Sequence, residues 1–174
     1  YTVVQAGGGE SFYDLRCDIG KFYAAVALCE AASALSFEED ASPEMFVACV
    51  EGLRDMCADD ECFALIKFLV RALRLSGYGF SAGACDVCGR DLAGESRLRF
   101  DMQSGSFTCR DCGAGAGVSG STYAVLRAAG GRPCGDITED GKVRALRLLR
   151  EYFALKTDAR LNGLSEYIRL LRAE

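Results

Sequence analysis

Cys85-Asp-Val-Cys88-Gly89 and Cys109-Arg-Asp-Cys112-Gly113 lie in the middle of the chain, with 20 residues between Cys88 and Cys109. Each Cys-x-x-Cys pair puts two sulfurs on one tight turn, and the intervening segment can form a short hairpin that brings the two turns together. The glycine after each second cysteine can adopt a positive φ, which lets backbone N–H groups hydrogen-bond the sulfurs. The pattern therefore predicts a closed, tetrahedral, structural Zn²⁺ site made by Cys85, Cys88, Cys109 and Cys112.

The alternative for these four cysteines is two redox dithiols or a set of buried free thiols. A single Cys-x-x-Cys motif leaves that choice open, because thioredoxin-like proteins carry one. Two copies, each followed by glycine and flanking a hairpin pattern, favour a metal, and no βαβ pattern surrounds either copy. Four thiolates leave no open coordination position and the chain contains no His, so an enzyme is not expected.

The composition is typical of one compact domain or a small two-lobed unit, with 174 residues of which 50% are hydrophobic. No apolar run approaches the roughly 18 residues of a transmembrane helix. The start of the chain at Tyr1 lacks the charged and apolar regions of a signal peptide, and it lacks Met. We therefore expect a piece of a longer, cytoplasmic protein.

Ten cysteines raise the question of a secreted disulfide scaffold. Five of them fall in helix-like apolar segments, where free cysteine behaves as a small buried hydrophobe. These five are Cys17, Cys29, Cys49, Cys57 and Cys62. Scattered thiols together with a metal site fit a reducing cytoplasm better than a set of disulfides.

Charge is distributed unevenly along the chain. Residues 1–70 carry a net charge of −9, residues 71–140 are neutral, and residues 141–174 carry +4. The first segment should repel nucleic acid, and only the last helices should attract it. The basic residues that open this last segment are Lys142, Arg144, Arg147 and Arg150. Two interpretations of them stay open: an ordinary solvated helix face, or a patch for nucleic acid or an acidic partner.

The spacing of apolar residues predicts a mainly α fold, a helical bundle with a Cys₄ zinc ribbon inserted midway. Helices are expected over residues 12–36, 42–56, 62–75, 119–129, 141–155 and 164–172. Ser11 is the expected N-cap of the first helix, and Asp136–Glu139 has the spacing of a capping box before the fifth. The helix over 62–75 is apolar over most of its circumference and is expected to be central.

The ribbon is expected to contain a β-hairpin. Arg97–Asp101 alternates polar and apolar residues, as a strand does. Gln103-Ser-Gly105 has turn composition, and Ser106–Cys109 is expected to be the second strand of the hairpin. Gly113–Gly117 is expected to be a flexible connector, because no strand and no Lys-Ser/Thr pair accompany it as in a phosphate-binding loop.

Two stretches carry a resemblance to a known family. One stretch is Ala64-Leu-Ile-Lys-Phe-Leu-Val-Arg-Ala-Leu-Arg-Leu-Ser-Gly-Tyr-Gly79, which is followed by the two Cys-x-x-Cys-Gly motifs, called the cysteine knuckles below, around a hairpin. This order of features resembles the RecO family of bacterial recombination-repair proteins. Tyr13-Asp-Leu-Arg-Cys-Asp-Ile-Gly-Lys-Phe22 is similar to the point where that family leaves its N-terminal OB fold for its helical domain. The resemblance implies four segments: 1–10 as the end of the OB fold or a linker, 11–79 and 118–174 as two parts of the bundle, and 80–117 as the ribbon.

The resemblance also implies a function in DNA repair and homologous recombination. The family acts as a non-enzymatic mediator that anneals strands and, with RecR, helps load RecA onto single strands coated by single-stranded DNA-binding protein (SSB). Family contacts with DNA rely on the OB fold, so this acidic chain is expected to bind DNA weakly by itself. The implied location is the bacterial cytoplasm, at the nucleoid. The alternative is a zinc-ribbon adaptor or transcription-related domain unrelated to repair.

A binding site for the C-terminal tail of SSB follows from the same resemblance. The tail ends in an apolar residue and a carboxylate, and Lys67 matches the basic position of the family's tail-binding pattern. Arg71 follows four residues later on the same helix face, and Phe46 and Val50 on the preceding helix are expected to form walls. The alternative is that Lys67 and Arg71 are the polar edge of a buried helix.

Overall fold

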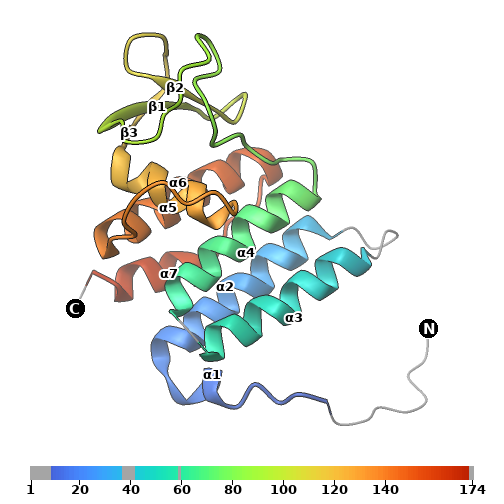
Figure 1. Cartoon of the computed structure of the whole chain (residues 1–174). Helices are drawn as coiled ribbons and strands as arrows, with labels where there is room; N and C mark the ends of the chain where they lie inside the picture. The colour runs from blue at the N-terminus through green and yellow to red at the C-terminus, as the bar shows by residue number, and fades with distance from the viewer. Residues whose placement is uncertain (1–8, 37–41, 59, 173–174) are drawn as a thin grey trace.

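The computed structural model describes residues 9–36, 42–58 and 60–172. In chain order the elements are α1 (Asp14–Cys17), α2 (Ile19–Leu35), α3 (Pro43–Ala58), α4 (Glu61–Leu75), β1 (Arg97–Asp101), β2 (Ser106–Cys109), β3 (Ala116–Ser119), α5 (Gly120–Ala129), α6 (Glu139–Thr157) and α7 (Asn162–Leu170). The small sheet lies at one end of the helical bundle, next to α5 and α6 (Figure 1). This architecture confirms the predicted helical bundle with an inserted ribbon. None of the described helices is both long and apolar enough to cross a membrane.

Helix α4 is the centre of the bundle, as its sequence predicts. It packs against α2, α3, α5 and α6, and its buried residues include Leu65, Ile66 and Leu69. Burial on several sides explains why its apolar residues are not confined to one stripe. The Asp60 carboxylate caps the helix by accepting a hydrogen bond of 3.0 Å from the Phe63 N–H.

The helix expected over residues 12–36 is two helices, so that prediction was wrong in this detail. Asp18 has extended backbone angles (φ −126°, ψ 129°) and separates α1 from α2. Its side chain accepts a hydrogen bond from the Lys21 N–H at 2.9 Å, which makes it the N-cap of α2. Ser11 is not a cap, because α1 begins after Tyr13 without a side-chain cap. The sequence contains a signal for this break, because an acidic residue such as Asp18 inside an apolar helical pattern is a preferred N-cap.

The cap of α6 also differs from the expected one. Thr138 accepts a hydrogen bond from the Gly141 N–H at 3.1 Å, so the helix begins at Glu139 rather than after a capping box at Asp136. The ends of the other predicted helices agree with the structure to within about two residues. The acidic sequence Glu38-Glu-Asp40, which is expected to be a loop, lies outside the described residues.

The sheet has three antiparallel strands in the order β2-β1-β3. The predicted hairpin is confirmed, with Phe100 paired to Phe107 across β1 and β2. The third strand was not predicted, because Gly113–Gly117 was expected to be a connector. Instead, residues 116–119 pair with β1, placing Gly117 opposite Arg99 and Ser119 opposite Arg97. The small residues hide the strand pattern, since only Val118 is both apolar and buried there.

The inner face of the sheet is fixed to the bundle by aromatic rings. Phe100 and Phe107 pack against each other with centroids 4.6 Å apart, and Tyr152 of α6 meets Phe100 at 5.4 Å. Tyr152 donates a hydrogen bond to the Tyr78 carbonyl, and Tyr123 of α5 donates one to the Gly83 carbonyl. The segment between α4 and the first cysteine knuckle is thereby held along α5 and α6.

The scattered cysteines are less buried than the sequence predicts. Cys62 is buried, but Cys17 and Cys29 are exposed, and Cys49 and Cys57 are half-buried. For Cys29 the reason is its place on α2, whose buried face passes through Ala27, Leu28 and Ala31 and leaves position 29 outside. All ten cysteines lie in the described ranges, and none forms a disulfide there.

Candidate metal centre and binding surfaces

The four knuckle cysteines converge on one point. Their sulfur atoms all lie within 4.8 Å of one another, and the Sγ atoms of Cys88 and Cys109 are 3.9 Å apart. A tetrahedral ion with metal–sulfur bonds of about 2.3 Å requires sulfurs about 3.8 Å apart. The arrangement therefore fits a metal ion, and in the described part of the chain no carboxylate joins the cluster. A closed set of four thiolates is the chemistry of a structural site.

Backbone groups of the knuckles support the sulfurs. The Cys109 N–H donates to the Cys85 Sγ at 3.3 Å, and N–H groups of Cys109 and Cys88 lower the pKa of the Cys85 thiol to about 6. These contacts favour the thiolate that a metal requires. The pKa of Cys112 is raised instead, to about 12, because its sulfur hydrogen-bonds those of Cys109 and Cys88.

The two knuckle glycines have different roles. Gly89 has a φ of 71°, and its N–H closes the first turn by donating to the Cys85 carbonyl at 2.8 Å. Gly113 has no positive φ, so the expected left-handed turn holds for the first knuckle alone. Gly113 instead lies against Thr108 and Arg99 of the sheet, where a Cβ atom would collide with the Thr108 side chain.

Lys67 and Arg71 lie at the rim of a pocket of about 490 Å³ between α3, α4 and the turn after α5. Its apolar lining includes Ala48, Ala64, Phe68 and Val70. Phe46 and Val50 do not line it, which corrects the predicted walls. Phe46 is 70% exposed, because the face of α3 that meets α4 passes through Ala48 and Gly52.

Lys67 and Arg71 already have carboxylate partners from α3, whereas Arg74, which also lines the pocket, has none among the described residues. The Lys67 ammonium lies 2.6 Å from the Asp55 carboxylate, and Arg71 pairs with Glu51. All four side chains are between one-third and just over half exposed. Surface ion pairs of this kind contribute little stability, so an incoming carboxylate can exchange with them.

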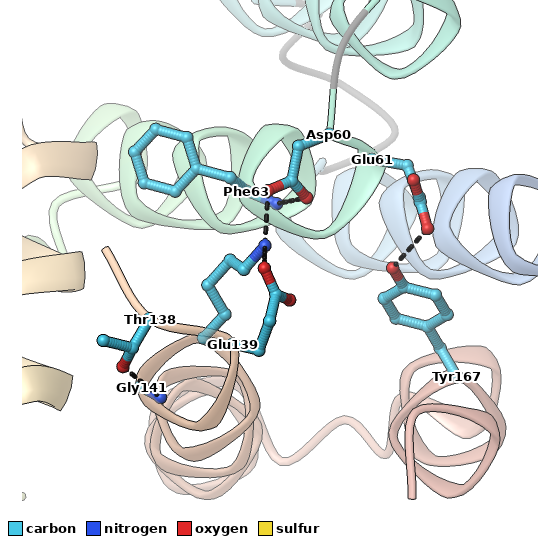
Figure 2. A network of polar contacts seen from close by, with 8 residues as sticks. Asp60, Glu61, Phe63, Thr138, Glu139, Gly141 and Tyr167 are labelled. Carbon is cyan, nitrogen blue, oxygen red and sulfur yellow. Dashed lines mark hydrogen bonds and ion pairs between the residues drawn. The ribbon is translucent and has the colours of Figure 1, made fainter. Parts of the chain in front are cut away.

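Lys142 does not belong to the predicted basic surface, which is a correction. Its side chain is only 5% exposed, and its ammonium lies 2.5 Å from both the Asp60 and Glu139 carboxylates. Figure 2 shows Asp60 and Glu139 pointing toward this position from α4 and α6. Lys142 therefore joins two helices of the bundle and is not available to a phosphate.

The remaining members of the predicted patch are divided. Arg144 is exposed and pairs with Asp140 at 2.6 Å, whereas Arg147 and Arg150 are half-buried. Arg144 and Arg147 line a hollow of about 440 Å³ between α6 and β3, and Arg150 is not part of its lining. The structure thus brings two of the four predicted basic residues together.

Three arginines outside the predicted patch line an adjoining hollow of about 460 Å³ on the outer face of the sheet: Arg97, Arg99 and Arg110. The alternation of residues 97–101 contains the signal for two of them. Successive strand residues face opposite sides, so Arg97 and Arg99 point away from the core that contains Leu98 and Phe100.

The sequence profile of the family described as "Recombination protein O C terminal" matches residues 16–165, which include both cysteine knuckles and all helices from α2 to α6. The chain belongs to this RecO family. The expected resemblance is thereby confirmed for nearly the whole chain.

Individual relatives agree with the family assignment. A DNA repair protein RecO of Frankia casuarinae is 32% identical over 114 residues, which cover 64% of this chain and 46% of the relative. One of Desulforudis audaxviator is 30% identical over 111 residues, covering 64% and 44%. One of Halorhodospira halophila is 29% identical over 171 residues, covering 98% of this chain and 70% of the relative. The chain spans about half the length of the first two relatives.

Proposed function

We propose that this chain is the helical and metal-binding portion of a DNA repair and recombination mediator that acts through contacts with RecR, SSB and DNA and has no enzymatic activity. The observation that carries the proposal is the RecO family match over residues 16–165. The closed cysteine cluster supports it, because four sulfurs with the spacing of a tetrahedral site leave no place for a substrate. A mediator of this kind belongs in the bacterial cytoplasm, at the nucleoid.

Zn²⁺ is the ion that suits the cysteine cluster best. Four thiolates in a tetrahedral array are the preferred donors of structural zinc, and hard cations such as Mg²⁺ prefer oxygen. The ion would be held by Cys85, Cys88, Cys109 and Cys112. Its contribution is to folding, since binding energy in such sites is folding energy.

The pocket between α3 and α4 is the site that we propose for the SSB tail. A peptide that ends in an apolar residue and a carboxylate needs an apolar cavity with a cation at its rim. Phe68, Ala48 and Val70 supply the cavity, and Lys67 and Arg71 supply the cations. Asp55 and Glu51 already pair with these two cations, so the tail carboxylate competes with them there, whereas Arg74 in the same lining has no carboxylate partner among the described residues.

Titration with a labelled acidic peptide from the C-terminus of a bacterial SSB tests this assignment. Lys67→Ala/Arg71→Ala should weaken binding at least about tenfold, or about 1.4 kcal/mol. Glu51→Gln/Asp55→Asn should tighten binding instead, because it frees both cations without removing the cavity. A peptide with a C-terminal carboxamide should bind weakly to every variant.

The comparison of the carboxylate peptide with the carboxamide peptide is the sharpest part of the test. A surface whose net charge alone attracts the peptide would respond to both double substitutions but would not distinguish carboxylate from carboxamide. Equal affinity of wild type and Lys67→Ala/Arg71→Ala, or no binding to either, would remove the pocket as the tail site.

A further inference from the structure

Strand β3 lies at the edge of the sheet, and two hollows meet along it. Gly117, Val118 and Ser119 line both. Arg97, Arg99 and Arg110 line the first hollow, on the sheet, and Arg144 and Arg147 line the second, against α6. The two hollows share these three residues of the edge strand and are lined by five arginines in all; together they are named here the β3 groove.

Positive charge in the β3 groove is largely uncompensated. No carboxylate lines the first hollow, and among the described residues none of its three arginines has a carboxylate within 4.0 Å. The second hollow contains one carboxylate, Glu151, and its Arg144 pairs with Asp140 of the same helix. The groove therefore attracts a polyanion although the chain as a whole has a net charge of −5.

Nearby carboxylates of the ribbon are engaged elsewhere. Asp101 accepts hydrogen bonds from the Gln103 N–H and the Ser104 hydroxyl. Glu95 and Asp111 both lie on Arg90, at 3.9 and 3.8 Å. These contacts leave the three arginines of the first hollow without a carboxylate partner among the described residues.

The sheet spaces the arginines regularly and keeps the groove open. Arg97 and Arg99 are two residues apart on one strand, so their Cα atoms are separated by about 6.6 Å along the same face. Their partners across the sheet are Ser119 and Gly117, which are too small to fill the space beside them. In addition, the Arg147 Nε atom is buried without a hydrogen-bond acceptor in the described part of the chain.

We propose that the β3 groove binds the phosphodiester backbone of DNA through these arginines. This proposal rests on the proposed function and names a DNA-binding surface for it. The planar guanidinium group binds phosphate oxygens in a bidentate manner, and a row of arginines suits a ligand with repeated anionic groups. The lining contains no aromatic ring, so the groove has no platform for base stacking and contacts the backbone alone.

Fluorescence anisotropy with a labelled single strand, and with its duplex, tests the proposal on the whole chain at low salt. Arg97→Ala/Arg99→Ala/Arg110→Ala should weaken binding of both probes at least about tenfold and reduce the slope of log K against log salt by about 2 to 3. The matched control is Arg160→Ala/Arg169→Ala/Arg172→Ala, which removes the same charge from exposed positions near α7. The control should stay within about threefold of wild type.

A second variant keeps all the arginines. A Cβ atom added at Gly117 would meet no other atom within 4 Å, and the residue has no positive φ, so Gly117→Glu adds a carboxylate to the groove without disturbing the core. Gly117→Glu should weaken DNA binding, and Gly117→Ala should not. Equal losses in the arginine variant and its control, or unchanged binding in Gly117→Glu, would overturn the proposal.

The SSB peptide separates this proposal from the proposed function. The groove variants should bind that peptide with wild-type affinity, which also shows that they are folded. Wild type that binds the peptide but neither DNA probe at low salt would overturn the DNA groove alone. Tight binding of a poly-glutamate peptide in the groove, without DNA binding, would instead identify a protein ligand and also overturn it.

Discussion

Gly113 directly follows the last cysteine of the cluster, and the sheet leaves no room there for a side chain. A Cβ atom at this position would overlap the Thr108 hydroxyl and lie 2.7 Å from the Thr108 Cβ and 3.3 Å from the Arg99 Cβ. Thr108 is buried and its hydroxyl has no partner among the described residues. The second knuckle and β2 are therefore packed directly against each other.

Gly113→Ala should destabilise the ribbon by about 1–3 kcal/mol, because overpacking forces the knuckle away from the strand. Chemical denaturation of the metal-loaded protein measures the change. Gly117→Ala is the matched control, since its Cβ meets nothing within 4 Å, and it should be neutral. Adding Thr108→Ala should restore only part of the stability lost in Gly113→Ala, because it removes the overlapping hydroxyl but keeps the Thr108 Cβ. An unchanged stability of Gly113→Ala would contradict the packing described above.

At the scale of elements, the Lys142 ion pairs join the N-terminal ends of α4 and α6. Burial opposes the charge of Lys142, but the hydrogen bonds that its ammonium donates to the Asp60 and Glu139 carboxylates outweigh burial and raise the pKa of the ammonium. Burial likewise opposes the charge of Asp60, yet the hydrogen bonds from Lys142 and the Phe63 N–H lower the pKa of its carboxyl. Each partner thus keeps the other charged.

Lys142→Met should destabilise the fold by about 1–3 kcal/mol, because the methionine keeps the packing while Asp60 loses its partner. Partial exposure of Asp60 keeps the loss below that of a fully buried pair. Asp60→Asn is the companion variant, since asparagine retains the N-cap. In a double-mutant cycle the two losses should be less than additive; full additivity would show that the pair does not couple the helices.

The pH dependence of this pair follows from the two pKa shifts. Asp60 has a lowered pKa in the folded state, so its contribution is complete above its ordinary pKa of 3.8 and is lost as pH falls through the lower folded value. Lys142 has a raised pKa, so its contribution is complete below its ordinary value of 10.5 and is lost above it. The destabilisation by Lys142→Met should be constant between about pH 5 and 9 and shrink only in strong acid or base.

Sequence periodicity predicted the long elements well and the short ones poorly. α4 combines an acidic N-cap, a dense apolar run and a following glycine turn, and all three signals agree. β3 has only Val118 to mark it, and its pairing depends on β1, which lies far from it in the sequence. The break at Asp18 was hidden because apolar residues continue on both sides of it.

At the scale of the whole molecule, the buried residues of the ribbon and of the helices form one continuous core. The sheet is anchored to α5 and α6 by Phe100, Phe107 and their tyrosine neighbours. The second knuckle begins at Cys109, the last residue of β2, and the only large apolar side chain of the two knuckle turns is Val87, which is exposed, so the metal is expected to hold the turns. Metal removal should therefore unfold the knuckles and loosen the sheet while the helices persist.

The metal site and the surfaces differed in how far the sequence could predict them. Local spacing sets where the cysteine sulfurs lie, so the four cysteines could be predicted to meet, and the structure brings them together in a cluster that could hold a metal ion. Surface properties depend on packing between distant segments. That is why Lys142 is buried by α4, why Phe46 lies outside the pocket, and why two β1 arginines join two α6 arginines across β3.

Measuring how much metal the cysteine cluster binds is the most direct test of the structural metal centre, because the ribbon, the cysteine knuckles and the β3 groove all depend on that centre. Metal analysis of protein kept in reducing buffer should give about one Zn²⁺ per chain, bound by four sulfurs at about 2.3 Å. Cys85→Ser/Cys88→Ser should abolish it and lose the sheet while keeping helical circular dichroism. Less than about half an equivalent of metal in the wild type, with Cys85 and Cys88 joined in a disulfide, would contradict the structural metal centre.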